Sequence, residues 1–198
     1  KWDFNFVDNQ NKAAALSTDQ IDVENAKRYG ITFVDEKGEK QYPLILHCSP
    51  SGAIERDVYA LLEKAYKEQQ NGRSPMLPVW LSPTQVRMIP ISDSFLKDVE
   101  EMTKEVEAHC IRVDIDDRAL TLQKKVREAE MEWVPYIVVI GKREIESKAI
   151  PVRDRLTGKV RTMKLKELIS EIEKSAINKP YKPLPLPKYV SKRPQFHG

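Results

Sequence analysis

Leu46-His47-Cys48-Ser49-Pro50-Ser51-Gly52-Ala53-Ile54-Glu55-Arg56 joins an apolar run to an amphipathic segment through a turn rich in serine, proline and glycine. The apolar residues 42–46 predict a strand that ends at His47, and the apolar spacing of residues 53–66 predicts a helix. A helix N-terminus offers free N–H groups and a positive dipole end, and Arg56 adds a permanent charge one turn later. The corner is therefore suited to present a metal ligand together with a cation for nucleotide phosphates.

Residue type alone does not establish such a site. A histidine at a strand end is more often a hydrogen-bonded structural residue, and an arginine in a first helical turn is more often a surface charge. The core Gly52-x-x-x-Arg56, however, resembles the third signature motif of class II aminoacyl-tRNA synthetases, and His47, nine residues before the arginine, is similar to the threonyl-tRNA synthetase version. Further stretches resemble the same family in the same order, namely residues 18–22 with 29–35, 78–86 and 134–144. By this resemblance, the chain is identified as the C-terminal portion of a threonyl-tRNA synthetase of archaeal type.

The resemblance divides the chain into three parts. Residues 1–72 are expected to form the C-terminal part of a class II catalytic domain, residues 73–178 an anticodon-binding domain, and residues 179–198 a proline-rich basic strap. The polar run 68–75 is typical of a linker between domains. The implied fold class is α/β: an α+β catalytic fragment with an antiparallel sheet, followed by an α/β domain with a mixed five-stranded sheet.

Apolar periodicity predicts the elements of both domains. In the first domain, residues 2–7 predict a strand, and residues 31–35 and 41–47 predict a hairpin around a glycine-containing loop. In the second domain, strand and helix patterns alternate, which indicates a mixed sheet with helices on both faces. Its predicted strands are residues 79–81, 86–89, 110–115, 136–140 and 149–153, and its predicted helices are residues 92–108, 120–130 and 165–175.

The resemblance also assigns catalytic roles to residues of the first domain. Arg56 matches the arginine that binds the tail phosphates of ATP, where cations stabilise the charge that develops on the leaving pyrophosphate. Gln20 and Gly52 match residues that line the nucleotide and amino-acid cleft, and Lys1 resembles a cleft lysine. His47 matches the last of three ligands to a zinc ion that binds the amino and hydroxyl groups of threonine. Valine lacks that hydroxyl group and would lose the bond to zinc.

The other two zinc ligands and the arginine of the second signature motif have no counterpart in this chain. We therefore expect the fragment alone to bind no zinc tightly and to be inactive, while its parent uses ATP and Mg²⁺ to join threonine to its tRNA. A zinc site built from His47-Cys48 and His109-Cys110 is disfavoured, because neighbouring strand residues point to opposite faces. The prolyl enzyme, a second class II candidate, is disfavoured by His47.

Anticodon recognition is the expected role of the second domain. The resemblance implies that Glu144 and Arg153 hydrogen-bond anticodon bases, with Arg127 and Arg118 nearby. Splayed bases are recognised at their hydrogen-bonding edges, which suits a carboxylate and a guanidinium group. By residue type alone, Glu144 is more simply a solvated loop charge. Trp133 could either stack on a base or fill the core.

The net charge of +3 is unevenly distributed. Residues 176–198 contain five basic and no acidic side chains, which leaves the rest of the chain slightly negative. This distribution favours recognition of one folded RNA over nonspecific coating, and no DNA partner is expected. The tail also carries apolar side chains, among them Tyr189, Val190 and Phe196, so we expect it to lie against the body as a strap.

Cysteine usage and hydropathy suggest a compartment. Cys48 and Cys110 are isolated thiols, which suggests a reducing compartment, and no apolar run approaches the roughly 20 residues that span a bilayer. We expect the chain to be a fragment of a longer cytoplasmic enzyme that is a homodimer at full length. The enzyme should bind tRNA(Thr) and should not bind a membrane. The competing hypothesis is a stand-alone or partner-dependent module that binds tRNA without catalysis.

Overall fold

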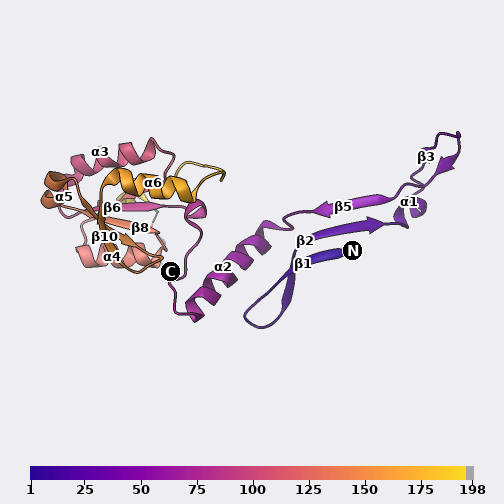
Figure 1. The fold of residues 1–198 in the computed structure, drawn as a ribbon, viewed down its shortest axis with the longest axis horizontal. Helices are drawn as coiled ribbons and strands as arrows, with labels where there is room; N and C mark the ends of the chain where they lie inside the picture. Colours follow the sequence, from indigo (N-terminus) through magenta and orange to yellow (C-terminus); the bar gives the residue numbers. More distant parts are fainter. Residues whose placement is uncertain (195–198) are drawn as a thin grey trace. The chain divides into compact units, whose positions relative to one another are not determined.

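The computed structural model describes residues 1–194 and divides into two compact units, Lys1–Gln70 and Asn71–Gly198. The first unit is built on a three-stranded antiparallel sheet of order β1-β2-β5, which Figure 1 shows with the helix α2 that follows it. The strands are β1 (Trp2–Val7), β2 (Ala13–Asp22) and β5 (Ile45–Ser49), and α2 spans Ile54–Gln70. Between β2 and β5 lie the short helix α1 (Asn25–Arg28) and a small hairpin of β3 (Phe33–Val34) and β4 (Lys40–Gln41).

The bounds predicted for the two hairpin strands are wrong. The two strands of the hairpin pair as expected, but β4 ends at Gln41 and the chain resumes strand structure only at Ile45. Pro43 has no N–H group to donate and interrupts the run. The second half of the predicted strand then pairs with β2 instead of β3. As a result His47 lies in the middle of β5 and not at a strand end, which corrects the prediction.

The helix α2 is held to one face of the first sheet by aromatic and polar contacts. The ring of Phe6 in β1 meets the edge of Tyr59 in α2 at 5.3 Å between centroids. The Tyr59 hydroxyl donates a hydrogen bond of 2.9 Å to Asp8, and this contact raises the pKa of Tyr59 to about 12. Trp2 and Phe4 alternate with Phe6 in the same strand and therefore share its face, yet they remain exposed. Part of this apolar face is thus uncovered in the chain.

The second unit contains a five-stranded mixed sheet of order β10-β9-β8-β6-β7. Its strands β6 (Val86–Pro90), β7 (Val113–Ile115) and β8 (Tyr136–Ile140) are parallel, whereas β9 (Ile150–Asp154) and β10 (Val160–Met163) continue the sheet antiparallel. The helices are α3 (Leu96–Glu107), α4 (Leu122–Met131), α5 (Lys142–Ser147) and α6 (Leu165–Ser175). The predicted fold class, with an antiparallel sheet and then a mixed five-stranded sheet, is confirmed.

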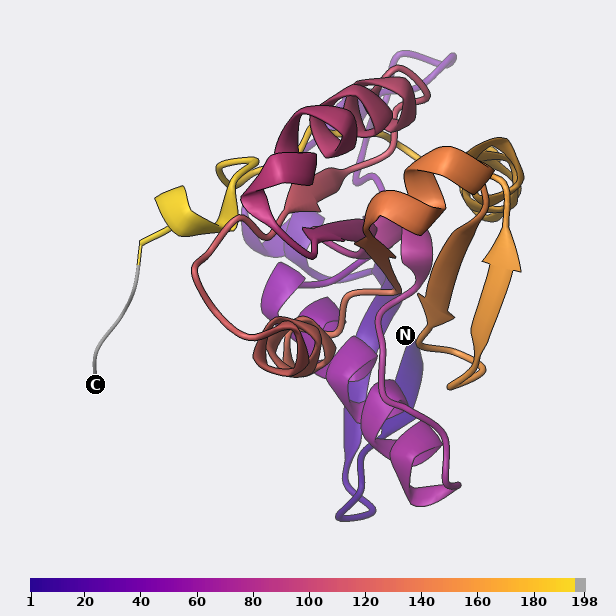
Figure 2. The same cartoon turned by 90° about the vertical axis from the view of Figure 1, so that its left-hand side faces the viewer.

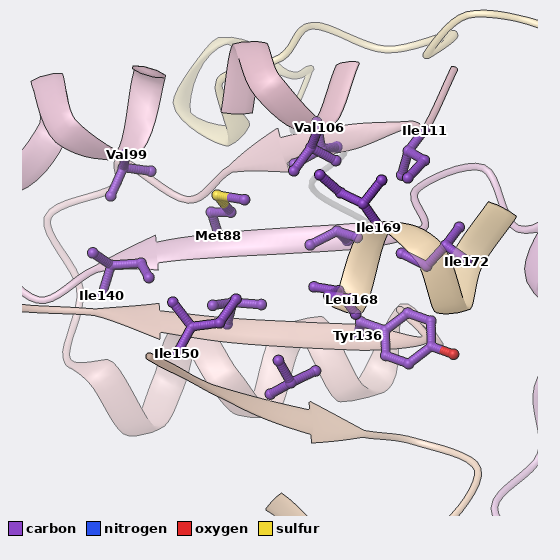
Figure 3. Close-up of a cluster of buried hydrophobic side chains, with 14 of the residues drawn as sticks. Met88, Val99, Val106, Ile111, Tyr136, Ile140, Ile150, Leu168, Ile169 and Ile172 are labelled. Carbon is purple, nitrogen blue, oxygen red and sulfur yellow. The ribbon is translucent and has the colours of Figure 1, made fainter. Parts of the chain in front are cut away.

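The helices of this unit cover both faces of the sheet. In Figure 1, α3 and α6 lie on one side of the strands and α4 on the other. Figure 3 shows the larger core, in which Val99 and Val106 of α3 and Leu168 of α6 pack on the strands. A smaller cluster under α4 contains Ile89 and Ile137. Both faces of the central strands are therefore buried, as the near-continuous apolar runs of β6 and β8 predict.

Several local predictions for this unit are wrong. Residues 79–81 form a 3-10 helix, η1 (Val79–Leu81), because Pro78 and Pro83 enclose a segment too short for a strand. The strand predicted for residues 110–115 shrinks to β7, since Cys110 has a positive φ of 56°. The helix α5 and the strand β10 were not predicted.

Residues 186–194 run beside the edge strand β7. Tyr189 forms a parallel bridge with Ile115, and a short 3-10 helix, η3 (Val190–Lys192), follows. Phe196, one of the apolar residues on which the expected strap depended, lies outside the described residues.

Candidate functional site

The register of the first sheet places three of the predicted site residues, Lys1, Gln20 and His47, along one face. Gln20 lies directly opposite His47 in the pairing of β2 with β5, and directly opposite residues share a face. Thr18, two residues before Gln20, is opposite Asp3, whose carboxylate is 3.3 Å from the Lys1 ammonium group. Lys1, Gln20 and His47 therefore lie along the same side of the sheet.

Gly52 allows the corner that follows β5. Its φ of +61° lies in the left-handed region, and a Cβ built at this position would lie only 2.4 Å from the carbonyl oxygen of Leu16 in β2. The turn thus presses against β2 at a point where only glycine fits. Arg56, in the first turn of α2, donates from Nη1 to the carbonyl oxygen of Ala15 at 3.1 Å. The exposed guanidinium group of Arg56 is therefore held beside β2.

His47 is the only side chain of the first unit with a proposed metal role. Residues 1–194 contain no group of three His, Cys, Asp or Glu side chains placed to bind a metal ion together. Cys48 lies opposite Asp19 and points away from the face of His47, and a hydrogen bond from the thiol to Asp19 raises the pKa of Cys48. His109 accepts or donates a 2.8 Å hydrogen bond with Glu173 in the second unit. The donor set fits one ligand of a larger site, and zinc bound there would supply Lewis-acid contacts to a substrate amine and hydroxyl.

The predicted anticodon residue Arg153 lies on the face of the sheet that α4 partly covers. Arg153 in β9 is opposite Ile137, which packs under α4, and opposite Val160 in the outer strand β10. Its guanidinium group is 3.4 Å from Glu130 of α4, and its side chain remains 43% exposed. Val160 is also exposed, so the outer strands form an open shelf beside α4. In Figure 2 the two orange strands of this hairpin stand to one side of α4, which is seen end-on below the centre.

Arg127 and Glu144 lie on different helices, and Glu144 lines a pocket with Glu101 and Met102 of α3 instead of the shelf beside α4. Arg127 lies on α4, is exposed, and its side chain makes no hydrogen bond or ion pair within residues 1–194. The simpler interpretation of Glu144, a solvated charge in a loop, is not met, because Glu144 lies in the first turn of α5. One of its carboxylate oxygens accepts a 3.0 Å hydrogen bond from the N–H group of Gly141. The contact caps the helix and leaves the side chain half-buried.

Arg118 is bound to carboxylates of its own chain. Its Nε and Nη2 donate to Asp116 at 2.8 and 2.6 Å, and its Nη1 donates to Glu128 at 2.5 Å. Asp116 is fully buried, and its carbonyl oxygen accepts a hydrogen bond from the buried Lys125. These ion pairs hold the guanidinium group of Arg118 against Asp116 and Glu128, with one N–H group on each of Nη1 and Nη2 left over.

The four predicted residues do not form one cluster. Arg118 follows β7 and Arg153 lies in β9, and two strands, β8 and β6, separate them in the sheet. Three strand spacings of about 4.8 Å separate the two strands, although both side chains reach glutamates of α4, Arg118 at Glu128 and Arg153 at Glu130.

Arg155 was not predicted as a functional residue. Its Nε donates to the carbonyl oxygen of Pro75 at 2.8 Å and its Nη1 to that of Glu130 at 2.6 Å. The guanidinium carbon lies 5.9 Å from the ring of the half-buried Trp133. This contact explains the position of Trp133 by packing within the chain. Because Arg155 and Trp133 are distant in sequence, no local sequence signal could have revealed their contact.

Comparison with known proteins agrees with this geometry. Residues 85–175 match the family model of an anticodon-binding domain. The RNA-binding domain of threonyl-tRNA synthetase from Cryptosporidium parvum has a similar fold, with a TM-score of 0.67, 24% identity, and coverage of 91% of this chain and 43% of that one. Prolyl-tRNA synthetase from the same organism gives a TM-score of 0.68 at 26% identity, covering 82% and 35%. The fold and family model thus define the second unit as an anticodon-binding domain of an aminoacyl-tRNA synthetase.

The sequence relatives distinguish between these synthetases. Threonine–tRNA ligase of Pyrococcus horikoshii is 58% identical over all 198 residues, and that of Nitrosopumilus maritimus is 52% identical over 196. The chain covers 32% of the length of each relative. Along its length the chain is thus similar to threonine–tRNA ligases of archaea, as its motifs predicted. Within residues 1–194, no helix combines the length and apolar character needed to cross a membrane.

Proposed function

We propose that this chain is the C-terminal part of a threonine–tRNA ligase that recognises the anticodon of tRNA(Thr) through residues 73–178. The observation that carries the proposal is the similarity to threonine–tRNA ligases along the whole chain, which includes both units. The open shelf beside α4 supports it further, because an exposed sheet surface with a cation at its centre suits splayed bases. We place the parent enzyme in the cytoplasm as a homodimer.

Within this proposal, Arg153 and Glu144 recognise bases through their hydrogen-bonding edges. Arg153 retains free N–H groups on its exposed side, since its contact with Glu130 is a single ion pair at 3.4 Å. Glu144 uses one carboxylate oxygen for the cap of α5 and keeps the other for an amino group of a base. Arg127 supplies an exposed cation that binds the phosphate backbone of the RNA.

Filter binding of the full chain to a threonine tRNA transcript and to the same transcript with a changed anticodon tests this role. Arg153→Ala or Glu144→Ala should weaken binding of the cognate transcript by about 1 to 3 kcal/mol and leave the changed transcript nearly unaffected. Lys174→Ala is the matched control, because it removes one exposed charge from α6 on the opposite face of the sheet. Equal weakening of both transcripts by Arg153→Ala would exclude base recognition.

The first unit contributes one side of the catalytic cleft in our proposal. Arg56 binds the terminal phosphates of ATP, which the parent uses with Mg²⁺, and Gln20 and Lys1 contact the nucleotide and amino acid from the shared sheet face. Gly52 keeps the corner close to β2, and His47 is the one zinc ligand that this chain supplies. The parent enzyme should lose zinc and threonine activation on His47→Ala. Retention of both would exclude this role of His47.

The alternative function is a tRNA-binding module without catalysis. The uncovered apolar side chains Trp2 and Phe4 of the first sheet favour the ligase or a partner-dependent module over a stand-alone module, because exposed apolar patches usually mark an interface with further protein. The mass of the natural gene product distinguishes the two hypotheses. A natural product of about the mass of this chain would favour the module.

A further inference from the structure

The strap, residues 186–194, extends the sheet at its outermost parallel strand. The N–H group of Ile115 in β7 donates to the carbonyl oxygen of Lys188 at 2.9 Å, and Tyr189 bridges to Ile115. Because β7 has three residues and lies at the sheet edge, the strap provides pairing that the strand would otherwise lack. The strap is therefore a structural neighbour of the chain segment that leaves β7.

That segment is the reading loop, which we define as residues 116–121 between β7 and α4. Its first residue, Asp116, is fully buried and bound by Arg118. The next residue, Asp117, turns the other way, to the strap. Its two carboxylate oxygens accept hydrogen bonds from the N–H group of Ser191 at 3.0 Å and from the Ser191 hydroxyl at 2.6 Å. The carboxylate of Asp116 thus binds Arg118 within the loop, and the carboxylate of Asp117 binds the strap.

The strap is anchored on both sides of Ser191. Beyond it, Nη2 of Arg193 donates to the buried Asp114 at 2.6 Å, and Nε of Arg193 donates to the carbonyl oxygen of Pro187 at 3.1 Å. Asp114 also receives two hydrogen bonds from the fully buried Arg87. An arginine bound to a buried carboxylate is costly to remove, so Ser191 is presented by a firmly held segment.

A second set of strap contacts points away from the reading loop. The Lys188 ammonium group is 2.6 Å from Glu107, and the Tyr189 hydroxyl donates to Glu100 at 2.5 Å. Both acids belong to α3 and not to the reading loop. These contacts hold the strap on the body and do not touch residues 116–121.

From this arrangement we propose that Ser191 is a positioning residue for anticodon discrimination: through Asp117 it holds the reading loop in the conformation that meets the RNA. The inference rests on the proposed function, since it assumes that the second unit recognises the anticodon. The charge-assisted hydrogen bonds from Ser191 limit the conformations of a loop that precedes α4 and carries Arg118. Release of Asp117 should therefore change which bases the domain accepts more than it changes how tightly it binds RNA in general.

The test measures discrimination as a ratio, namely the dissociation constant of the full chain for the anticodon-changed transcript divided by that for the threonine tRNA transcript. Ser191→Ala should lower this ratio at least about fivefold, Asp117→Ala should lower it further, and Ser191→Thr, which keeps the hydroxyl group, should preserve it. Tyr189→Phe is the matched control. It also removes one hydroxyl contact from the strap, but to α3, and should leave the ratio unchanged.

Hydrogen exchange of residues 116–121 provides a readout that does not depend on tRNA. Exchange in this loop should rise in Ser191→Ala and Asp117→Ala and stay unchanged in Tyr189→Phe. A wild-type ratio of one would overturn anticodon recognition itself. If the wild-type chain discriminates and both Ser191→Ala and Asp117→Ala keep its ratio, the positioning role alone is overturned. This holds whether or not hydrogen exchange in the loop rises.

Discussion

Replacement of Gly52 by alanine tests the account of the corner between β5 and α2. A Cβ at this position would lie 2.4 Å from the Leu16 carbonyl oxygen, whereas ordinary contacts of a Cβ begin at 3.4 Å, so the backbone must move by about 1 Å. The positive φ adds about 1 to 2 kcal/mol for an L residue. Overpacking against backbone costs a further 1 to 3 kcal/mol or so, which gives roughly 2 to 5 kcal/mol in total.

Gly38 offers a matched control within the same unit. Its φ of +81° is also left-handed, but a Cβ there would have no atom within 4 Å. Gly38→Ala should therefore cost only the conformational term of about 1 to 2 kcal/mol. The difference between the two variants isolates the contact with Leu16.

Hydrogen exchange followed by mass spectrometry is a suitable assay, because it measures local opening of β2 and β5 without requiring the whole chain to unfold. Gly52→Ala should increase exchange in peptides of both strands far more than Gly38→Ala does. Equal exchange in the two variants would refute the reasoning, since it would show that the Leu16 carbonyl has room to move. In that case the glycine would be needed for its φ alone.

Two further predictions concern buried charge in the second unit. Asp114→Asn deprives the fully buried Arg87 of its charged, bidentate partner and should cost about 3 to 5 kcal/mol in urea unfolding, whereas Glu173→Gln in an exposed pair should cost less than about 1 kcal/mol. A cost for Asp114→Asn as small as that of the surface variant would contradict this. Burial by itself would raise the pKa of Asp116, but hydrogen bonds from Arg118 and its charge outweigh burial and lower the pKa below the ordinary 3.8. Asp116 thus contributes stability that is present above its unfolded-state pKa and is lost as the pH falls through its folded-state pKa. Asp116→Asn should therefore weaken the dependence of the urea unfolding midpoint on pH in the acid range. An unchanged dependence would show that another group controls it.

Elements with strong local periodicity were predictable from the sequence. The strands β1 and β8 and the helix α6 begin and end at the predicted residues. Each depends on an apolar repeat that its own residues carry. The helix α5 and the strand β10 lack this signal: α5 has six residues, and β10 owes its place to pairing with β9.

The candidate sites divide in the same way. Motif spacing indicated Gly52 and Arg56, because a tight turn into a helix is a local event, and the positive φ of Gly52 agrees with it. The mid-strand position of His47 was not predictable, since it depends on whether β5 pairs with β2 or with the hairpin. The internal partners of Arg118 were equally hidden, although Asp116 is only two residues away.

By itself, the sequence determined the resemblance to threonine–tRNA ligases and the elements that carry their own apolar repeat. Only the tertiary structure decided that Gln20 faces His47, that Arg118 is bound within the chain and that Ser191 of the strap holds Asp117. The physical reason is the range of the interactions. Periodicity and turn chemistry act over a few residues, whereas strand register and buried ion pairs join residues that are distant along the chain and gain their free energy only once the core excludes water.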